Sequence, residues 1–189
     1  MKSSFVQFPI FNFQITWRPF QLNPDMPKEG IDRKLYLEKK FGGKDKAIQA
    51  YQSINEAGIK NNIYFQFDKI KITPNSFASH KLLALAHKFN KQTEVMETIF
   101  YNYFIEGIDI GNINELIKIS KQHNIFDKNT KSYLESNEDK QNLLEEENHA
   151  RELGIQGVPC FIINKEIVLF GAQNKENFIN IFKSISDVN

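Results

Sequence analysis

The sequence predicts an α/β protein in which a long all-helical segment separates two parts of one small domain. Near the N-terminus, residues 11–20 alternate between apolar and polar side chains, which is the period of a half-buried strand. Residues 28–153 carry a succession of helical periods bounded by glycine and asparagine. Two short apolar runs, at residues 160–164 and 167–170, then flank a tight turn and precede a last amphipathic helix.

The alternating segment is expected to form a strand that ends, or is confined to a sheet edge, at Pro19. Phe13, Ile15 and Trp17 share one face of this strand. Arg18 points to the other face because side chains alternate along a strand. We expect Arg18 to pair with an acidic side chain of a helix rather than to bind an anionic ligand.

Turn and cap residues divide the helical segment into seven expected helices, at residues 32–41, 46–57, 75–89, 92–106, 112–122, 130–134 and 139–153. Asp32 and Asn75 are expected N-caps. Gly42-Gly43 should stop the first helix, and Gly58 should cap the second at its C-terminus. The acidic run Glu145–Glu147 is interpreted as a solvated helix face with no chemical role.

After residue 153 the order is strand, strand, helix, with Gly157-Val158-Pro159 leading into the first of these strands. Together with the early strand, this order is most of a thioredoxin-like layout, without that layout's first strand and the helix after it. We therefore expect residues 1–27 and 154–189 to form the two parts of a thioredoxin-like domain, and residues 28–153 to form the helical insertion.

Composition excludes several classes of function. The chain has 24 basic and 23 acidic residues, a net charge of +1, and no clustered basic surface for nucleic acid or membrane lipid. No apolar run approaches the length of a membrane span, and no cleavable signal is recognisable, so we expect a cytoplasmic protein. Its single cysteine, Cys160, excludes an internal disulfide, and the histidine spacing suggests no metal site.

The sequence resembles the DsbA-like thiol–disulfide oxidoreductases of the FrnE type, and the match runs from about Phe13 to the C-terminus. Eight blocks carry the resemblance in the family's order: Trp17–Pro27, Gly30, Tyr36–Leu37, Phe41–Gly43, Thr73–Ser76 with His80, Tyr103–Ile110, Glu152–Pro159 and Gly171–Gln173. The resemblance implies a thioredoxin fold with a helical insertion. It also implies either thiol–disulfide exchange or glutathione chemistry, as in the related 2-hydroxychromene-2-carboxylate isomerases and kappa-class glutathione transferases.

The sequence departs from the family pattern at the catalytic motif. In the FrnE-type proteins a Cys-x-x-Cys lies just before the region where this sequence begins, and the glutathione-using relatives have a serine there. A strand and helix bearing such a motif need about 30 residues, and only 16 precede Trp17. We therefore expect an N-terminally truncated member without a catalytic residue. Three explanations for the missing strand and helix remain open. The chain is a mis-started gene product, it is a decayed and inactive remnant, or the gap is filled by residues 5–8, by a partner or by a rearranged sheet.

Candidate site residues follow from the resemblance. Val158 and Pro159 are the expected substrate-binding residues, because the family's proline is cis and leaves the preceding backbone free to pair with an extended peptide or glutathione. A trans proline that merely begins a strand is the alternative. Asn75, His80 and Cys160 are candidates to line the cleft, although His80 equally fits a packing or capping role. Cys160 is expected to be a buried core thiol rather than a nucleophile.

Three functional hypotheses remain open. The first is a FrnE-type oxidoreductase by descent that is inactive in dithiol exchange, and the second is a glutathione-dependent isomerase or transferase. The third is a non-catalytic module that binds peptides in a chaperone-like way. The expected partners are a thiol or disulfide peptide or glutathione, with a homodimer as a further expectation and with no bound cofactor.

Overall fold

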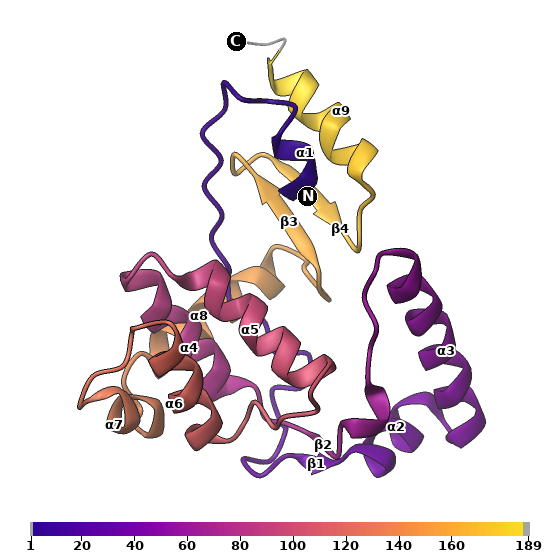
Figure 1. Ribbon diagram of the computed structural model, residues 1–189, viewed down its shortest axis with the longest axis vertical. Coiled ribbons are helices and arrows are strands. Elements are labelled where there is room, and N and C mark those ends of the chain that lie inside the picture. The colour runs from indigo at the N-terminus through magenta and orange to yellow at the C-terminus, as the bar shows by residue number, and fades with distance from the viewer. Residues whose placement is uncertain (1, 187–189) are drawn as a thin grey trace. The chain divides into compact units, whose positions relative to one another are not determined.

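The computed structural model describes residues 2–186 and consists mostly of helices (Figure 1). The helices are α1 (Lys2–Phe5), α2 (Arg33–Phe41), α3 (Lys44–Lys60), α4 (Phe77–Lys88), α5 (Gln92–Phe104), α6 (Ile113–Gln122), α7 (Thr130–Glu135), α8 (Lys140–Glu152) and α9 (Lys175–Ser186). The strands are β1 (Ile31–Asp32), β2 (Ile72–Thr73), β3 (Cys160–Ile163) and β4 (Ile167–Phe170), and a 3-10 turn covers Phe67–Lys69.

The chain divides into two compact units that are described separately below. The hairpin unit combines residues 1–22 with residues 146–189. The helical unit comprises residues 23–145. Helix α8 begins in the helical unit and ends in the hairpin unit.

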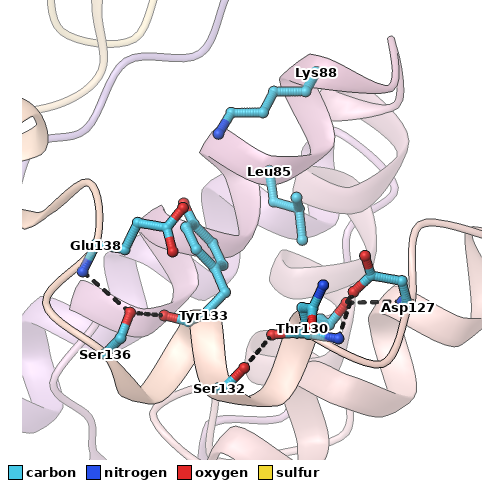
Figure 2. A pocket seen from close by; sticks show the side chains of 9 residues that line it. Leu85, Lys88, Asp127, Thr130, Ser132, Tyr133, Ser136 and Glu138 are labelled. Atoms are coloured by element: carbon cyan, nitrogen blue, oxygen red, sulfur yellow. Dashed lines mark hydrogen bonds between the residues drawn. The ribbon is translucent and has the colours of Figure 1, made fainter.

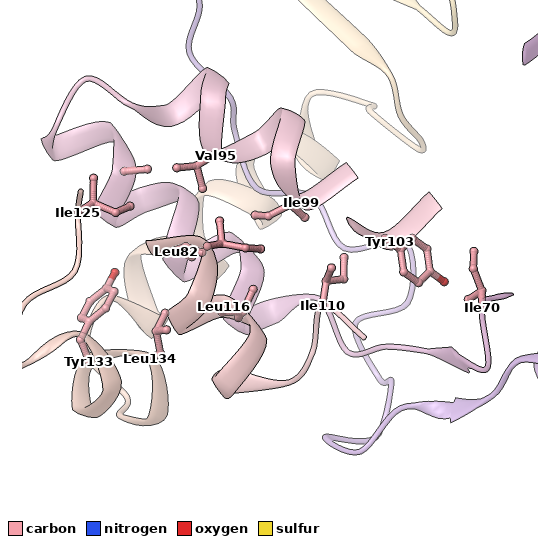
Figure 3. Packing of buried hydrophobic residues seen from close by; sticks show 12 residues of the cluster. Ile70, Leu82, Val95, Ile99, Tyr103, Ile110, Leu116, Ile125, Tyr133 and Leu134 are labelled. Carbon is pink, nitrogen blue, oxygen red and sulfur yellow. The ribbon is translucent and has the colours of Figure 1, made fainter. Parts of the chain in front are cut away.

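A single apolar core holds the helical unit together. Helices α4, α5, α6 and α7, with loops before and between them, provide its side chains, and Figure 3 shows most of these pointing toward one another. The core residues are Ile70, Leu82, Ala86, Val95, Ile99, Tyr103, Ile110, Leu116, Ile119, Ile125, Tyr133 and Leu134. Burying side chains of this size provides most of the free energy that holds such helices in place.

Helices α2 and α3 form a hairpin of helices at the other side of the helical unit. Asp32 caps α2 as expected, because its carboxylate accepts hydrogen bonds from the backbone N–H groups of Lys34 and Leu35. Gly42 ends α2 in the left-handed conformation. The prediction for α3 was wrong at its C-terminus, because the helix continues through Gly58 to Lys60. Glycine is needed at residue 58 for packing rather than for ending the helix, since a Cβ atom there would come within 2.7 Å of the ring of Phe65.

The guanidinium of Arg33 connects the start of α2 to the rest of the helical unit through hydrogen bonds. It is buried and donates hydrogen bonds to the hydroxyls of Tyr51 in α3 (2.5 Å), Tyr103 in α5 (3.0 Å) and Thr73 in β2 (3.3 Å). The rings of Tyr51 and Tyr103 also lie within 5.2 and 5.9 Å of its central carbon. One side chain therefore joins three elements that are distant in the sequence.

The short strands β1 and β2 pair antiparallel and bring the start of α2 close to the start of α4. Gly30, just before β1, adopts a left-handed conformation with φ of 75°. A Cβ atom at this position would come within 2.6 Å of the carbonyl oxygen of Thr73. The pairing of β1 with β2 therefore requires glycine at residue 30.

In the hairpin unit, strands β3 and β4 pair antiparallel, with Cys160 opposite Phe170 and Ile162 opposite Val168. Asn164 and Lys165 make the tight turn between them with positive φ angles. One face of the hairpin packs with α9 and the N-terminal residues around Phe8, Phe178 and Phe182. The side chains that complete this cluster are Phe5, Phe11, Phe13, Phe161, Ile163, Leu169, Ile179, Ile181 and Ile185.

The strand expected at residues 11–20 is not formed. The predicted alternation is present, because residues 11, 13, 15 and 17 are half-buried and residues 12, 14, 16 and 18 are exposed. However, residues 12–16 make no backbone–backbone hydrogen bond with any other described residue. The segment is extended because its phenylalanines pack onto the core beside α9, and no strand lies within hydrogen-bonding distance of it.

The acidic run of α8 corrects a second expectation. Glu145 is exposed, and Glu146 pairs with Arg18 at 3.4 Å, as the alternation had suggested for Arg18. Glu147, in contrast, is buried. Its carboxylate accepts hydrogen bonds from Arg151 (2.6 Å) and from the backbone N–H of Gln21 (3.0 Å), so it fixes the end of the N-terminal segment to α8.

Candidate functional site

A shallow pocket of about 520 Å³ surrounds the predicted Val158–Pro159 position. Its lining residues are Gly154, Gln156, Gly157, Val158, Pro159, Phe170 and Gly171. The loop after α8 provides the first five of these, and the end of β4 provides the last two. The Val158–Pro159 peptide bond is cis, and the side chain of Val158 is exposed.

The lining of this pocket is uncharged and mixes apolar side chains with backbone polar groups. None of its lining residues carries a charge, and its polar groups are the Gln156 amide and the backbone. A Cβ atom placed on Gly154, Gly157 or Gly171 would meet no other atom within 4 Å, so the backbone there is open to a ligand. Such a lining suits an extended peptide, which offers backbone hydrogen bonds and apolar side chains.

Cys160 follows directly on the pocket and is half-buried rather than buried. This exposure corrects the expectation of a core thiol, because Cys160 and Phe170 occupy the hairpin face that does not contact the core around Phe178. Loss of solvent contact nevertheless raises the pKa of the Cys160 thiol above its usual range. A raised pKa lowers the thiolate fraction at neutral pH and makes the sulfur a poor nucleophile.

Asn75 and His80 belong to the helical unit, whereas Val158, Pro159 and Cys160 belong to the hairpin unit. The side chain of Asn75 joins two loops, since its amide donates to the carbonyl of Met26 (2.7 Å) and its oxygen accepts from the N–H of Phe77 (2.9 Å). His80 has its Nε2 atom 3.5 Å from the hydroxyl of Ser76, one turn earlier. Both side chains therefore have local structural contacts at the start of α4.

A second pocket, of about 480 Å³, lies between α4 and α7 in the helical unit, as Figure 2 shows. Its rim is polar, but its hydroxyls are engaged with nearby protein groups: Thr130 with Asp127, Ser132 with Asn129 and Ser136 with Tyr133. These contacts are the caps and turns of α7. The rim hydroxyls therefore stabilise the local structure of α7 and are not free to bind a ligand without losing these contacts.

Next to this pocket lies a buried lysine that the sequence analysis did not single out. Lys81 donates hydrogen bonds to the carbonyls of Tyr133 and Ser136, which lie at the C-terminal end of α7. Burial lowers the pKa of Lys81, although Glu138 and Asp139 oppose this shift. In the sequence Lys81 adjoins the apolar run of α4. Only the tertiary structure shows that its ammonium group caps the C-terminal end of α7.

Among residues 2–186 no cluster of His, Cys, Asp and Glu side chains could hold a metal ion. No helix in the same range is both long and apolar enough to cross a bilayer.

Comparison with known proteins decides the family. The family model of the DSBA-like thioredoxin domain matches residues 6–183, which is nearly the whole chain. The chain belongs to the DSBA-like thioredoxin domain family. The uncharacterized protein YwbO of Bacillus subtilis (strain 168) is 27% identical over 175 residues, which cover 92% of this chain and 82% of that protein.

Among solved structures, a probable DsbA oxidoreductase from Streptomyces coelicolor superposes with a TM-score of 0.86 at 18% sequence identity. The superposition covers 97% of this chain and 80% of that one. This likeness and the family match confirm the predicted fold class, a thioredoxin-like fold with a large helical insertion. Within this DSBA-like fold, the pocket beside Val158 is the candidate functional site.

Proposed function

We propose that the chain is a FrnE-type member of the DSBA-like family that does not carry out dithiol–disulfide exchange as these 189 residues stand. In its place we propose that it binds extended peptide segments beside Val158 and Pro159. The single observation that carries the first part is the cysteine inventory: one thiol, Cys160, whose pKa is raised by loss of solvent contact. Dithiol exchange needs a thiolate and a second, resolving thiol.

The FrnE assignment is supported by the ordered blocks that run from Trp17 to Gln173. A cytoplasmic location is part of the proposal, since a lone cysteine suits a reducing compartment.

The lining of the pocket favours a peptide over glutathione. At neutral pH glutathione carries two carboxylates and an ammonium group, and such charges require charged or strongly polar partners when they leave water. The seven lining residues offer none with a charge. A peptide segment with apolar side chains needs only the backbone groups and the exposed side chains of Val158 and Phe170.

Catalysis is tested by insulin reduction with this chain, with dithiothreitol or glutathione as the reductant. We expect the rate to equal that of the reductant alone, and we expect Cys160→Ala to change nothing. Turnover above that background, lost in Cys160→Ala, would show the proposal to be wrong.

Binding is tested by fluorescence polarisation with a labelled, cysteine-free peptide of alternating valine and threonine. Val158→Asp should weaken binding at least several-fold because it places an unpaired charge against the apolar side chains of a bound peptide. Val6→Asp, at an exposed valine elsewhere in the hairpin unit, is the matched control and should leave binding unchanged. Loss of peptide binding in Cys160→Ala would contradict a role that is independent of thiol chemistry, and calorimetry with glutathione tests the alternative ligand.

A further inference from the structure

The turn that joins β4 to α9 forms one side of the pocket beside Val158. Phe170 and Gly171 are the two lining residues that this side provides. The N–H of Gly171 donates to the carbonyl of Pro159 at 2.8 Å, one residue pair beyond the pairing of Cys160 with Phe170 in the hairpin. The position of this turn is therefore linked directly to the proline side of the pocket.

Gln173 lies outside the lining but bonds to both of these residues. Its Nε2 atom donates to the carbonyls of Phe170 (2.9 Å) and Gly171 (3.3 Å). Its Oε1 atom accepts a hydrogen bond from the side-chain amide of Asn177, in the first turn of α9, at 2.8 Å. Asn174 accepts from the N–H of Asn177 at 2.8 Å and so caps α9. One amide group therefore connects the β4 side of the pocket to the start of α9.

We propose that Gln173 is a positioning residue for peptide binding. It holds the backbone of Phe170 and Gly171 in the geometry that receives an extended peptide. This role rests on the function proposed above, since it concerns the same pocket. It also gives a physical task to the block Gly171–Gln173, one of those that carry the family resemblance.

The contacts at residue 173 require a side chain that donates and accepts at once. The two backbone carbonyls offer only acceptors, whereas the amide nitrogen of Asn177 offers a donor. A primary amide has donors on its nitrogen and an acceptor on its oxygen. A lysine would have no acceptor for Asn177, and a carboxylate would have no donor for the carbonyls. The chemistry of glutamine therefore matches all three contacts.

The turn has little else to order it beside the pocket. Gly171 has a φ of 77°, and a Cβ atom there would meet no other atom within 4 Å. Glycine has the greatest backbone freedom of any residue, so an unrestrained turn would lose more entropy when a peptide binds. The bonds of Gln173 are exposed, and water can replace them at little cost to folding. Gln173 should therefore matter more for binding than for stability.

Peptide binding by variants of the whole chain tests this role, with the labelled valine and threonine peptide blocked at both ends. Gln173→Met keeps the side-chain length but loses all three contacts, and should bind roughly three- to tenfold more weakly. Gln173→Glu should be as weak at about pH 7, because a carboxylate repels the carbonyls. It should regain affinity at about pH 4, since a protonated carboxyl group can donate. Gln14→Glu, at an exposed glutamine of the same unit, is the matched control and should bind like the unchanged chain at both pH values.

Amide hydrogen exchange of Gly171 gives a readout that needs no peptide. At about pH 7 its N–H should exchange several-fold faster in Gln173→Met than in the unchanged chain, while the melting temperature changes little. A large fall in the melting temperature, or an unchanged exchange rate, would show that Gln173 does not act by ordering this turn.

The binding results separate this role from the proposed function. If Gln173→Met bound like the unchanged chain, or if Gln173→Glu stayed weak at about pH 4, the role of Gln173 would be overturned and peptide binding would stand. If the unchanged chain did not bind the peptide, the proposed function would be refuted and the role of Gln173 with it.

Discussion

Removal of the Arg151 guanidinium should destabilise the hairpin unit far more than removal of a surface arginine. The Glu147 carboxylate has only 5% of its side chain exposed, and its partners are Arg151 at 2.6 Å and the N–H of Gln21 at 3.0 Å. Arg151→Met leaves this carboxylate buried with a single neutral donor. Breaking a buried ion pair from one side costs about 3–5 kcal/mol, and we expect about 3 because Arg151 itself is 39% exposed.

A second substitution should relieve this cost. Glu147→Gln keeps an oxygen that accepts both hydrogen bonds and removes the charge, so by itself it should cost only about 1 kcal/mol. In the double variant no unpaired ion remains buried. We therefore expect Glu147→Gln to recover about 1–2 kcal/mol of the free energy of unfolding lost in Arg151→Met.

Urea unfolding followed by the fluorescence of Trp17 measures these changes. Trp17 is the only tryptophan and lies in the hairpin unit, so it reports on that unit, while far-UV circular dichroism follows the whole chain. Arg18→Met is the matched control, because Arg18 is 70% exposed and its pair with Glu146 should contribute about 0.5 kcal/mol. The explanation would be refuted if the two arginine variants lost equal stability, or if Glu147→Gln further destabilised Arg151→Met.

Three further predictions concern the helical unit. Arg33→Met should destabilise it by about 2–3 kcal/mol, measured by thermal unfolding, because three hydrogen bonds from a charged donor are lost while the apolar length of the side chain is kept. Burial raises the pKa of Tyr103 to about 12, so above pH 10 the unfolded chain binds fewer protons than the folded one. The free energy of unfolding should then fall by about 2–3 kcal/mol between pH 10 and 12, and Tyr103→Phe should flatten this slope in urea titrations. Gly30→Ala should cost over about 2 kcal/mol and shift the melting temperature accordingly, whereas Gly42→Ala, also at a positive φ but in open space, should cost only about 1. Equal losses for the two glycine variants would refute the steric argument.

Local sequence patterns predicted most of the secondary structure because the forces behind them are local. Asp32 and Gly42 bound α2 through a side-chain cap and a left-handed residue, and both act within one turn of the helix. The alternation in residues 11–20 correctly identified the half-buried side chains. A paired strand did not follow, since pairing depends on whether another strand lies alongside, and the alternation contains no information about that.

At the candidate site, too, the sequence predicted the local motif but not the contacts between distant segments. The motif around Val158 and Pro159 was recognisable in the sequence, and the structure surrounds it with an uncharged pocket. The asparagine at position 75 was assigned to the cleft as well, but its contacts are with Met26 and Phe77 in the helical unit. Its role depends on a loop 49 residues away in the sequence, which no local pattern reports.

The sequence by itself determined the order of the helices from α2 to α9 and of the hairpin strands β3 and β4, the family resemblance and the presence of a single thiol, because each of these depends on residue types and short spacings. Only the tertiary structure decided which charged groups are buried. The sequence pattern assigned Glu147 to a solvated acidic face, and it did not distinguish Lys81 from other lysines beside the apolar run of α4. In the structure both side chains are buried and hydrogen-bonded. The physical reason is that the energy of a charge depends on the groups packed around it, and those groups come from distant parts of the chain.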